Sequence, residues 1–280
     1  MTAAPDAKSL AGADQWIRTI LRYRSKHPAL VRVLDVVERL MERPYRTNAL
    51  LLGPAGSGKE GLARAIHALM HAERDGAAFI EVSLAGRELH EVLAELCGDA
   101  SGPGQIERAD GGTLYIDEIG TLGREVQARV LAAVRGRVRR EGERDERRVS
   151  VAVVASTDVD IEREVVAGRF RHDLYWRIAR IVLTLPPLAE RQADIARTAV
   201  WIGNRVLEKL GVDRALSIEG EHDRGDIVLS PEAVAALTEY DWPGNFRELD
   251  AVLERALALY RTGDRVTGQD VRAALGLPPT

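Results

Sequence analysis

The stretch GPAGSGKE, residues 53–60, has the Gly-x-x-x-x-Gly-Lys spacing of a phosphate-binding loop. The glycines of such a loop let the backbone wrap around an anion, and the helix that follows adds its positive end. Lys59 is then the side chain that reaches the β- and γ-phosphates of a nucleotide. The next position departs from the usual pattern, because Glu60 stands where Ser or Thr ordinarily helps to hold magnesium.

The surrounding sequence has the order that a phosphate loop requires. TNALLL (47–52) is typical of a short buried strand, and KEGLARAIHALMHA (59–72) spaces its apolar residues as a helix does. A chance glycine turn is therefore the weaker alternative. The expected nucleotide contacts are consecutive: Gly53, Pro54, Ala55, Gly56, Ser57, Gly58, Lys59, Glu60 and Gly61.

An acidic pair, Asp117–Glu118, ends the apolar stretch TLYIDEI. Ligands of open α/β sheets bind at the C-terminal ends of the strands, which is where this pair would lie. Asp117 is the candidate magnesium ligand, acting through water and compensating for the missing hydroxyl at position 60. Glu118 is the candidate general base for an attacking water. Two acids that merely end a strand in solvent would be the better interpretation of the pair alone, but not in a chain with a phosphate loop upstream.

Strands and helices alternate through the first two thirds of the chain. The patterns predict strands at 47–52, 77–84, 112–119, 148–157 and 179–185, and helices at 27–43, 59–72, 87–97 and 124–135. Such alternation predicts an α/β fold, with a mostly parallel five-stranded sheet between helices.

The strand pattern fades after Pro186, and the rest of the chain has helical patterns at 193–211, 230–240, 245–260 and 267–276. We therefore predict three parts. They are an N-terminal extension (1–26) with one helix at 14–24, an α/β core (27–188) and a small helical domain (189–280).

Composition limits the partners that the chain can have. Its 280 residues are 45% hydrophobic and 29% charged, and the net charge of −4 argues against a general coat for nucleic acid or membranes. A single cysteine, Cys97, excludes an internal disulfide and fits a reducing cytosol. The N-terminus does not have a signal-peptide pattern, and the apolar runs are too short to cross a bilayer. We expect a cytoplasmic protein without membrane contact.

Six stretches together resemble the AAA+ ATPase domain of bacterial enhancer-binding proteins, the activators of sigma-54 RNA polymerase. They are GPAGSGKE, ADGGTLYIDEI, VAVVASTDVDI, GRFRHDLYWRI, LPPLAERQADI and WPGNFREL, in the family's order across roughly residues 27 to 275. The resemblance implies a P-loop core followed by a helical lid, ATP as ligand, Mg²⁺ as cofactor, ATP hydrolysis, and a hexameric or heptameric ring. It also accounts for Glu60, because this family commonly has Glu directly after the loop lysine.

The resemblance assigns further roles. Thr157 and Asp158 fall where the family senses the γ-phosphate. The family has Thr-Asn there, so Asp158 is a departure. Because its carboxylate can only accept hydrogen bonds, it needs magnesium or water between it and phosphate. Arg171 and Arg177 match arginine fingers that reach a neighbouring subunit's nucleotide, the plainer alternative being a solvated helix face. Arg247 matches a lid arginine that contacts phosphate.

Two departures from the family's sequence bear on how Glu118 is restrained and on which protein the chain contacts. Ser83 stands where the family has an Asn that restrains the catalytic glutamate, so Glu118 is expected to be less tightly held. The family's Gly-Ala-Phe-Thr-Gly-Ala loop, which grips sigma-54, does not occur. The corresponding segment, CGDASGPGQIER (97–108), is short and has no aromatic residue, which puts the usual sigma-54 contact in doubt.

Three functions stay open. The first is a ring ATPase that remodels an unidentified protein, or sigma-54 by another contact. The second is an orthodox sigma-54 regulator that uses a different loop. The third is a nucleotide-dependent assembly switch with slow turnover, which Asp158 and Ser83 favour and the Asp117–Glu118 pair opposes. The Arg-rich segment 135–148 is interpreted as a solvated hairpin rather than a contact for an acidic partner or nucleic acid, and no helix-turn-helix pattern indicates DNA binding.

Overall fold

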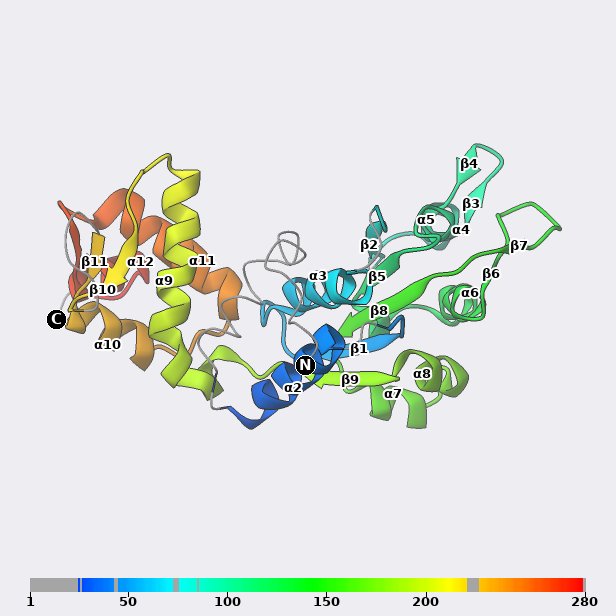
Figure 1. The fold of residues 1–280 in the computed structure, drawn as a ribbon, viewed down its shortest axis with the longest axis horizontal. Coiled ribbons are helices and arrows are strands. Elements are labelled where there is room, and N and C mark those ends of the chain that lie inside the picture. The colour runs from blue at the N-terminus through cyan, green and yellow to red at the C-terminus, as the bar shows by residue number, and fades with distance from the viewer. Residues whose placement is uncertain are drawn as a thin grey trace. The chain divides into compact units, whose positions relative to one another are not determined.

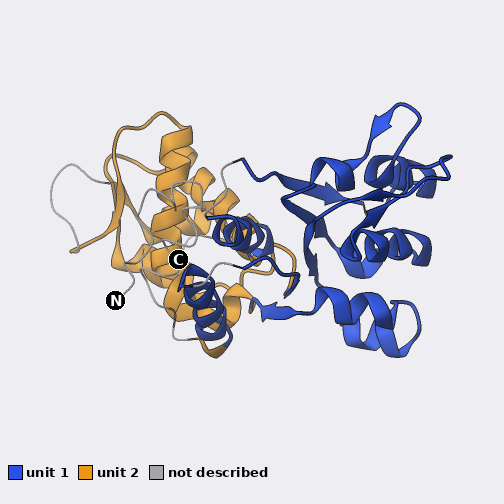
Figure 2. Cartoon of the chain, turned by 45° about the vertical axis from the view of Figure 1, so that its right-hand side comes forward, with its two compact units in different colours: residues 1–18, 29–53, 58–185 blue, residues 19–28, 54–57, 186–280 orange. Residues whose placement is uncertain are grey.

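The computed structural model describes residues 25, 27–42, 45–72, 76–84, 86–220 and 227–278, so the predicted helix at 14–24 lies outside the described residues. The chain divides into two compact units (Figure 2). Among the described residues, the first unit contains those within 29–53 and 58–185, and the second contains 25, 27, 28, 54–57 and those within 186–278. None of the helices within the described ranges combines the length and hydropathy needed to cross a bilayer.

A five-stranded parallel sheet forms the centre of the first unit, in the order β2-β5-β8-β1-β9 (Figure 1). Its strands are β1 (Ala49–Leu52), β2 (Phe79–Ser83), β5 (Thr113–Asp117), β8 (Ala152–Thr157) and β9 (Ile181–Thr184). The three central strands are almost entirely buried, as expected of a parallel sheet covered on both faces. The predicted α/β fold with five parallel strands is confirmed.

Helix α2 (Pro28–Glu42) precedes the first strand, and the strands are connected by α3 (Lys59–Met70), α4 (Leu89–Cys97), α5 (Gln105–Arg108), α6 (Arg124–Val134), α7 (Ile161–Val166) and α8 (His172–Ile178). Leu62, Ile66 and Leu69 bury one stripe of α3, at the spacing that the sequence predicts. That helix starts immediately after Gly58, whose φ of 101° favours glycine because a Cβ would be strained there.

Side chains alternate between the two faces of each strand and divide the core. Leu50, Ile116 and Val153 point to the face that α4, α6 and α8 cover, and all belong to one hydrophobic cluster with residues of those helices. Residues at the alternate positions, such as Thr113, face α3, where His67 and His71 contact the Thr113 hydroxyl.

The strand predicted at 148–157 begins later than expected, at Ala152. Arg147–Arg148 instead form β7, which pairs antiparallel with β6 (Arg137–Val138) in a hairpin. The continuous Val-rich pattern hides this break. Several arginines of the hairpin are paired with carboxylates of the hairpin itself or of α5: Arg137 with Glu146, Arg140 with Glu107, and Arg147 with Glu143. These pairs support the interpretation of a solvated hairpin.

A closed hairpin lies between α4 and α5, within the segment 97–108. Strands β3 (Gly98–Asp99) and β4 (Gly102–Pro103) pair antiparallel. The Asp99 carboxylate closes the turn by accepting hydrogen bonds from the amide and hydroxyl of Ser101. A Cβ on Gly98 would lie 2.5 Å from the Gly102 carbonyl oxygen, so the close approach of the two strands requires glycine.

The second unit is mainly helical, as predicted, with α9 (Gln192–Lys209), α10 (Pro231–Glu239), α11 (Asn245–Arg255), a π-helical turn (Ala256–Tyr260) and α12 (Gly268–Ala274). Side chains cap two of these helices: Ser230 accepts from the Ala233 amide, and Thr267 and Asp270 form a capping box. A small parallel sheet was not expected. Its strands β10 (Leu216–Ile218), β11 (Ile227–Leu229) and β12 (Arg265–Val266) are too short to give a periodic pattern.

A histidine pair joins α3 to β5. The Oγ1 atom of Thr113 lies 2.9 Å from Nδ1 of His67 and 3.2 Å from Nε2 of His71, and the two imidazole centroids are 4.9 Å apart. Burial lowers the pKa of His67, and the nearby charge of Arg64 acts in the same direction, against a hydrogen bond with the backbone of Ala77. The folded protein therefore resists protonation at this position.

We expect the free energy of unfolding to fall as the pH drops below about 6.5, because the unfolded chain then takes up a proton on His67 that the folded chain does not. His67→Gln should flatten this dependence, which urea unfolding at several pH values measures. His90→Gln, on an exposed histidine of α4, is the matched control. An unchanged slope in His67→Gln would contradict the expectation.

Candidate nucleotide site

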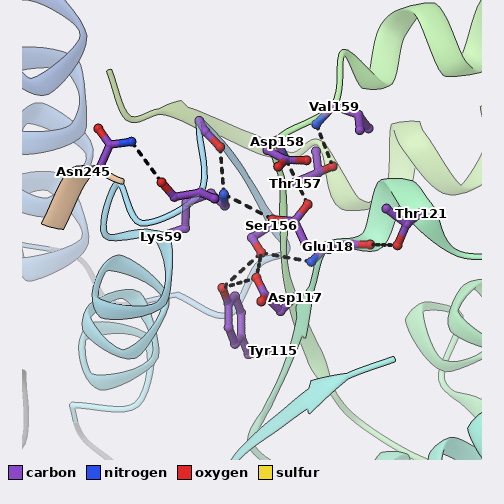
Figure 3. A network of polar contacts seen from close by, with 12 residues as sticks. Lys59, Tyr115, Asp117, Glu118, Thr121, Ser156, Thr157, Asp158, Val159 and Asn245 are labelled. Atoms are coloured by element: carbon purple, nitrogen blue, oxygen red, sulfur yellow. Dashed lines mark hydrogen bonds and ion pairs between the residues drawn. The ribbon is translucent and has the colours of Figure 1, made fainter. Parts of the chain in front are cut away.

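Lys59 is the first residue of α3, and its ammonium group is almost fully buried. Nζ donates to the Gly53 carbonyl oxygen at 2.7 Å and lies 3.3 Å from Oε1 of Glu118, while the side chain is only 6% exposed (Figure 3). The sheet order explains the meeting, because β1 and β5 run parallel and end at the same edge with β8 between them. The structure thus brings together the lysine of the glycine loop and the second acid of the Asp117–Glu118 pair.

Glu118 leaves the end of β5 with a left-handed backbone, at φ 53°. This turn directs its carboxylate to the loop, and Oε2 accepts a hydrogen bond from the Asp158 amide at 3.0 Å. The Thr121 hydroxyl donates to the Glu118 carbonyl oxygen at 2.8 Å, which further supports the turn. A non-glycine residue in this conformation is strained and is held only by its surroundings.

Opposing effects act on the Glu118 carboxyl. Burial is the largest and raises its pKa, and the charge of Asp158 acts in the same direction. The hydrogen bond from the Asp158 amide and the charge of Lys59 lower it, but the net result is a raised pKa. A carboxylate with a raised pKa accepts a proton more readily, which suits a general base.

The predicted sensor residues lie next to this group. Thr157 is fully buried at the end of β8, and its hydroxyl accepts from the Val159 amide at 3.3 Å. Asp158 is exposed. Ser83 ends β2 beside Asp117 in the backbone register, but among the described residues no hydrogen bond joins Ser83 to Glu118. Glu118 is held by Lys59 and by the Asp158 amide.

The two predicted arginine fingers belong to the region of α8. Arg171 precedes the helix, and its guanidinium donates two hydrogen bonds to Asp173, at 2.9 and 3.0 Å. Arg177 is exposed, and its carbonyl oxygen accepts from the side-chain amide of Asn48. Within the described part of the chain, neither guanidinium contacts Lys59, Asp117 or Glu118.

The turn Pro54–Ser57 groups with the second unit, where residues around the start of α11 hold it. Asn245 donates from its side-chain amide to the Ala55 carbonyl oxygen at 3.0 Å, and the Phe246 amide donates to that of Gly56. A Cβ on Gly56 would lie 2.6 Å from the Gly244 carbonyl oxygen and 3.5 Å from Cγ of Arg247. Arg247 therefore lies beside the glycine turn, with an exposed side chain.

Sequence reasoning missed Arg191, which contacts the same turn. Its guanidinium donates to the Ser57 carbonyl oxygen at 3.2 Å and lies over the Phe246 ring. Burial lowers its pKa to about 10. Asn245 was also missed, although it lies inside the WPGNFREL motif. Ser156 and Tyr115, which contact Asp117, had no signal in the sequence because buried strand residues of this kind are usually structural.

The loop and its surroundings fit a phosphate-bearing ligand. Gly53, Gly56 and Gly58 all have positive φ, as a backbone that wraps an anion requires. Two polar atoms in the second unit, Oγ of Ser57 and Nε of Arg191, are buried without a hydrogen-bond partner among the described residues. Such orphaned donors at a glycine turn are what a bound anion would satisfy.

Glu60 does not oppose such a ligand. Its carboxylate is paired with Nε of Arg64, one turn further along α3, at 3.0 Å. Gly61 follows it in the same helix.

The Asp117 carboxylate is the candidate magnesium ligand, and both hydrogen bonds that reach it end on Oδ1. Within the described residues nothing donates to Oδ2, so the site fits a hydrated Mg²⁺.

A parallel sheet with a glycine loop between β1 and α3, and an acidic pair ending β5, defines a P-loop protein of the α/β class. The sequence matches the sigma-54 interaction domain over residues 23–184 and the AAA+ ATPase lid domain over residues 190–277. The chain therefore belongs to the AAA+ family of sigma-54-dependent regulators, as the resemblance predicted.

The relatives include regulators of transcription. The chain is 36% identical over 248 residues to the Nif-specific regulatory protein of Klebsiella pneumoniae, covering 85% of this chain and 44% of the relative. It is 35% identical over 262 residues to the transcriptional regulatory protein ZraR of Escherichia coli (strain K12), covering 91% and 56%. The chain thus spans about half the length of the curated relatives it matches.

A similar solved structure is NtrX from Brucella abortus in complex with ATP. It has a TM-score of 0.77 and 30% sequence identity to this chain, and the match covers 91% of this chain and 55% of NtrX. NtrX from the same organism in complex with ADP matches with a TM-score of 0.76 and 28% identity, covering 98% of this chain and 61% of NtrX.

Asn245 gives a test of the glycine turn's support. Besides its bond to Ala55, its Oδ1 accepts from the buried Leu188 amide at 2.7 Å, and its own φ is 51°. Asn245→Gly keeps this backbone but leaves the Leu188 amide unsatisfied, which should cost about 1–3 kcal/mol of unfolding free energy. Asn245→Ala should cost about 1 kcal/mol more, because alanine is strained at positive φ. Urea unfolding measures both variants, and equal stability of Asn245→Gly and the wild type would contradict the assignment.

Proposed function

We propose that this chain binds ATP at residues 53–61 and hydrolyses it, with Glu118 as the general base. The observation that carries the proposal is the meeting of Lys59 and Glu118 at one edge of the sheet, 3.3 Å apart, with Asp117 ending the same strand. Membership of an AAA+ family and the likeness to an ATP-bound structure support it.

The contacts suggest how the residues would act. Lys59 contacts Gly53 and Glu118 in the structure, and a γ-phosphate would compete with Glu118 for its ammonium group. That exchange would free the Glu118 carboxylate to orient a water and take its proton. Mg²⁺, held through water by Asp117, would offset the negative charge of the phosphates. Thr157 and Asp158, next to Glu118, are proposed to sense the γ-phosphate.

Residues beside the glycine turn are proposed to supply further contacts to the nucleotide. Arg247, whose Cγ lies close to Gly56, is proposed as the lid arginine that reaches phosphate. Arg191 would contribute a buried positive charge behind Ser57. These roles would give partners to the buried donors at the glycine turn that have none among the described residues.

We propose that copies of the chain assemble into a hexameric or heptameric ring, in which Arg171 and Arg177 reach the nucleotide of the next copy. Arg177 is exposed and available to a neighbour. Arg171 would have to leave Asp173, and the exchange of one carboxylate for a phosphate keeps its bidentate geometry.

The output partner is proposed to be a protein that is not gripped through the usual sigma-54 loop. The segment in question forms the closed hairpin Gly98–Pro103, which presents no aromatic side chain. An orthodox sigma-54 regulator with a different contact loop is the second candidate, and its support is the family of the relatives.

A nucleotide-dependent assembly switch is the third candidate. The observation in its favour is the carboxylate of Asp158 beside Glu118, which adds negative charge where phosphate would bind.

ATP turnover across a range of protein concentrations separates a ring ATPase from the assembly switch. For a ring ATPase, turnover per subunit should rise with concentration. Lys59→Ala should lower it ~100-fold or more, and Arg171→Ala roughly 1,000-fold or more. Arg163→Ala, on a guanidinium that is 85% exposed, should change little. ATP binding without turnover at any concentration would favour the switch and contradict the proposed hydrolysis.

Asp158→Asn tests the electrostatics of Glu118. The charge of Asp158 raises the pKa of Glu118, so its removal should lower that pKa. Because the base must be deprotonated, turnover in the variant should persist to lower pH than in the wild type. The measurement is kcat against pH at saturating ATP, with Asp145→Asn on the exposed hairpin as control. An acid limb that stays in place or moves to higher pH would argue against Glu118 as the base.

A further inference from the structure

Ser156 is a buried hydroxyl at the centre of the polar network in Figure 3. It lies on β8, between β5 and β1, and is fully inaccessible to solvent. Its Oγ is 2.5 Å from Oδ1 of Asp117, 3.0 Å from the Tyr115 hydroxyl and 3.3 Å from the Glu118 amide nitrogen. One side chain therefore touches both members of the acidic pair.

The direction of each hydrogen bond follows from which groups carry protons. A carboxylate can only accept, so Ser156 donates its single proton to Asp117. The Glu118 amide can only donate, so it donates to Ser156. The Tyr115 hydroxyl then donates to the remaining lone pair of Ser156 or to Asp117 Oδ1, which is 3.1 Å away. When the phenol donates to Ser156, every bonding position of the Ser156 hydroxyl is in use.

Tyr115 is suited to remain a donor. It is 1% exposed, and a neutral phenol has one proton to donate. Its ring stacks on Phe79, with centroids 5.9 Å apart, which fixes the position of the hydroxyl. The phenol thus orients the Ser156 hydroxyl so that the serine proton points to Asp117.

Two consequences follow for the acidic pair. The hydrogen bond from Ser156 ends on Oδ1 of Asp117, the same oxygen that the Tyr115 hydroxyl can reach, so Oδ2 is left without a donor among the described residues. The Oγ atom of Ser156 also accepts a hydrogen bond from the Glu118 amide. Glu118 has a φ of 53°, a strained backbone conformation that its surroundings must support.

We propose that Ser156 is a positioning residue for hydrolysis, which sets both the Asp117 carboxylate for a hydrated Mg²⁺ and the backbone turn that aims Glu118, with Tyr115 orienting its hydroxyl. The role rests on the proposed ATPase function. A hydroxyl that merely filled the core would need one partner, whereas this one joins three groups, two of them in the acidic pair. Groups behind metal-binding side chains commonly change metal affinity or activity by about 10- to 100-fold when removed.

The first test is the Mg²⁺ dependence of nucleotide affinity and turnover, in the full chain. Ser156→Ala should raise the Mg²⁺ concentration for half-maximal turnover roughly 10-fold or more and lower kcat, while ADP affinity without metal stays within about twofold. Tyr115→Phe should shift the Mg²⁺ dependence in the same direction by less, because Ser156 can still donate. Ser217→Ala removes a buried hydroxyl that has no partner among the described residues and is the matched control.

A second measurement needs neither metal nor turnover. Amide hydrogen exchange at Glu118, followed by NMR without nucleotide, should be faster in Ser156→Ala and near wild type in Ser217→Ala. Mg²⁺ dependence and exchange both unchanged in Ser156→Ala would overturn the positioning role. If the wild type binds nucleotide but shows no turnover, the proposed hydrolysis fails, and the Mg²⁺ dependence of ADP affinity with the exchange rate still decides the role of Ser156.

Discussion

The positive charge of Lys59 is the constraint on which the first unit depends. An ammonium group that is 6% exposed is costly to bury, by several kcal/mol unless it is paired. The chain pairs it with a carbonyl oxygen from its own loop and with the carboxylate of Glu118, which belongs to another strand. That second partner is available only because the parallel order of β5, β8 and β1 ends all three strands at one edge. The parallel arrangement of these three strands therefore keeps the Lys59 charge buried and paired with a carboxylate.

The same compensation sets the state of Glu118. A carboxylate close to a buried ammonium would ordinarily have a low pKa, yet burial and the charge of Asp158 outweigh Lys59 and leave it raised. The lysine thus holds the glutamate in place without neutralising its basicity. Its tether to the Asp158 amide acts on the other carboxylate oxygen, so the two oxygens of one side chain have separate partners. A ligand that draws Lys59 away would change only one of them.

Much of this arrangement could be predicted from sequence, because it depends on local patterns. The glycine loop between a buried strand and a helix, and the acids at a strand end, each need only a few adjacent residues. What the sequence could not give depends on register and on distant contacts. Arg148 directly precedes the Val-rich run of residues 149–157, and only its pairing with β6 separates it from β8. The strands of the second unit, as short as Arg265–Val266, carry no periodicity at all. Asn245, inside a recognised motif, shows that a motif does not reveal which of its side chains makes the contacts.

The glycine loop has a further consequence for how its parts are supported. Gly53 and Lys59 are fixed by the sheet and by Glu118, whereas Pro54–Ser57 are fixed by backbone and side-chain donors of the second unit. Gly53 and Gly58, with φ of 148° and 101°, flank those four residues. Glycine tolerates a change of backbone angle there at little steric cost, while the hydrogen bonds of Asn245 and Arg191 keep the turn itself intact. The loop is therefore a rigid turn between two permissive residues.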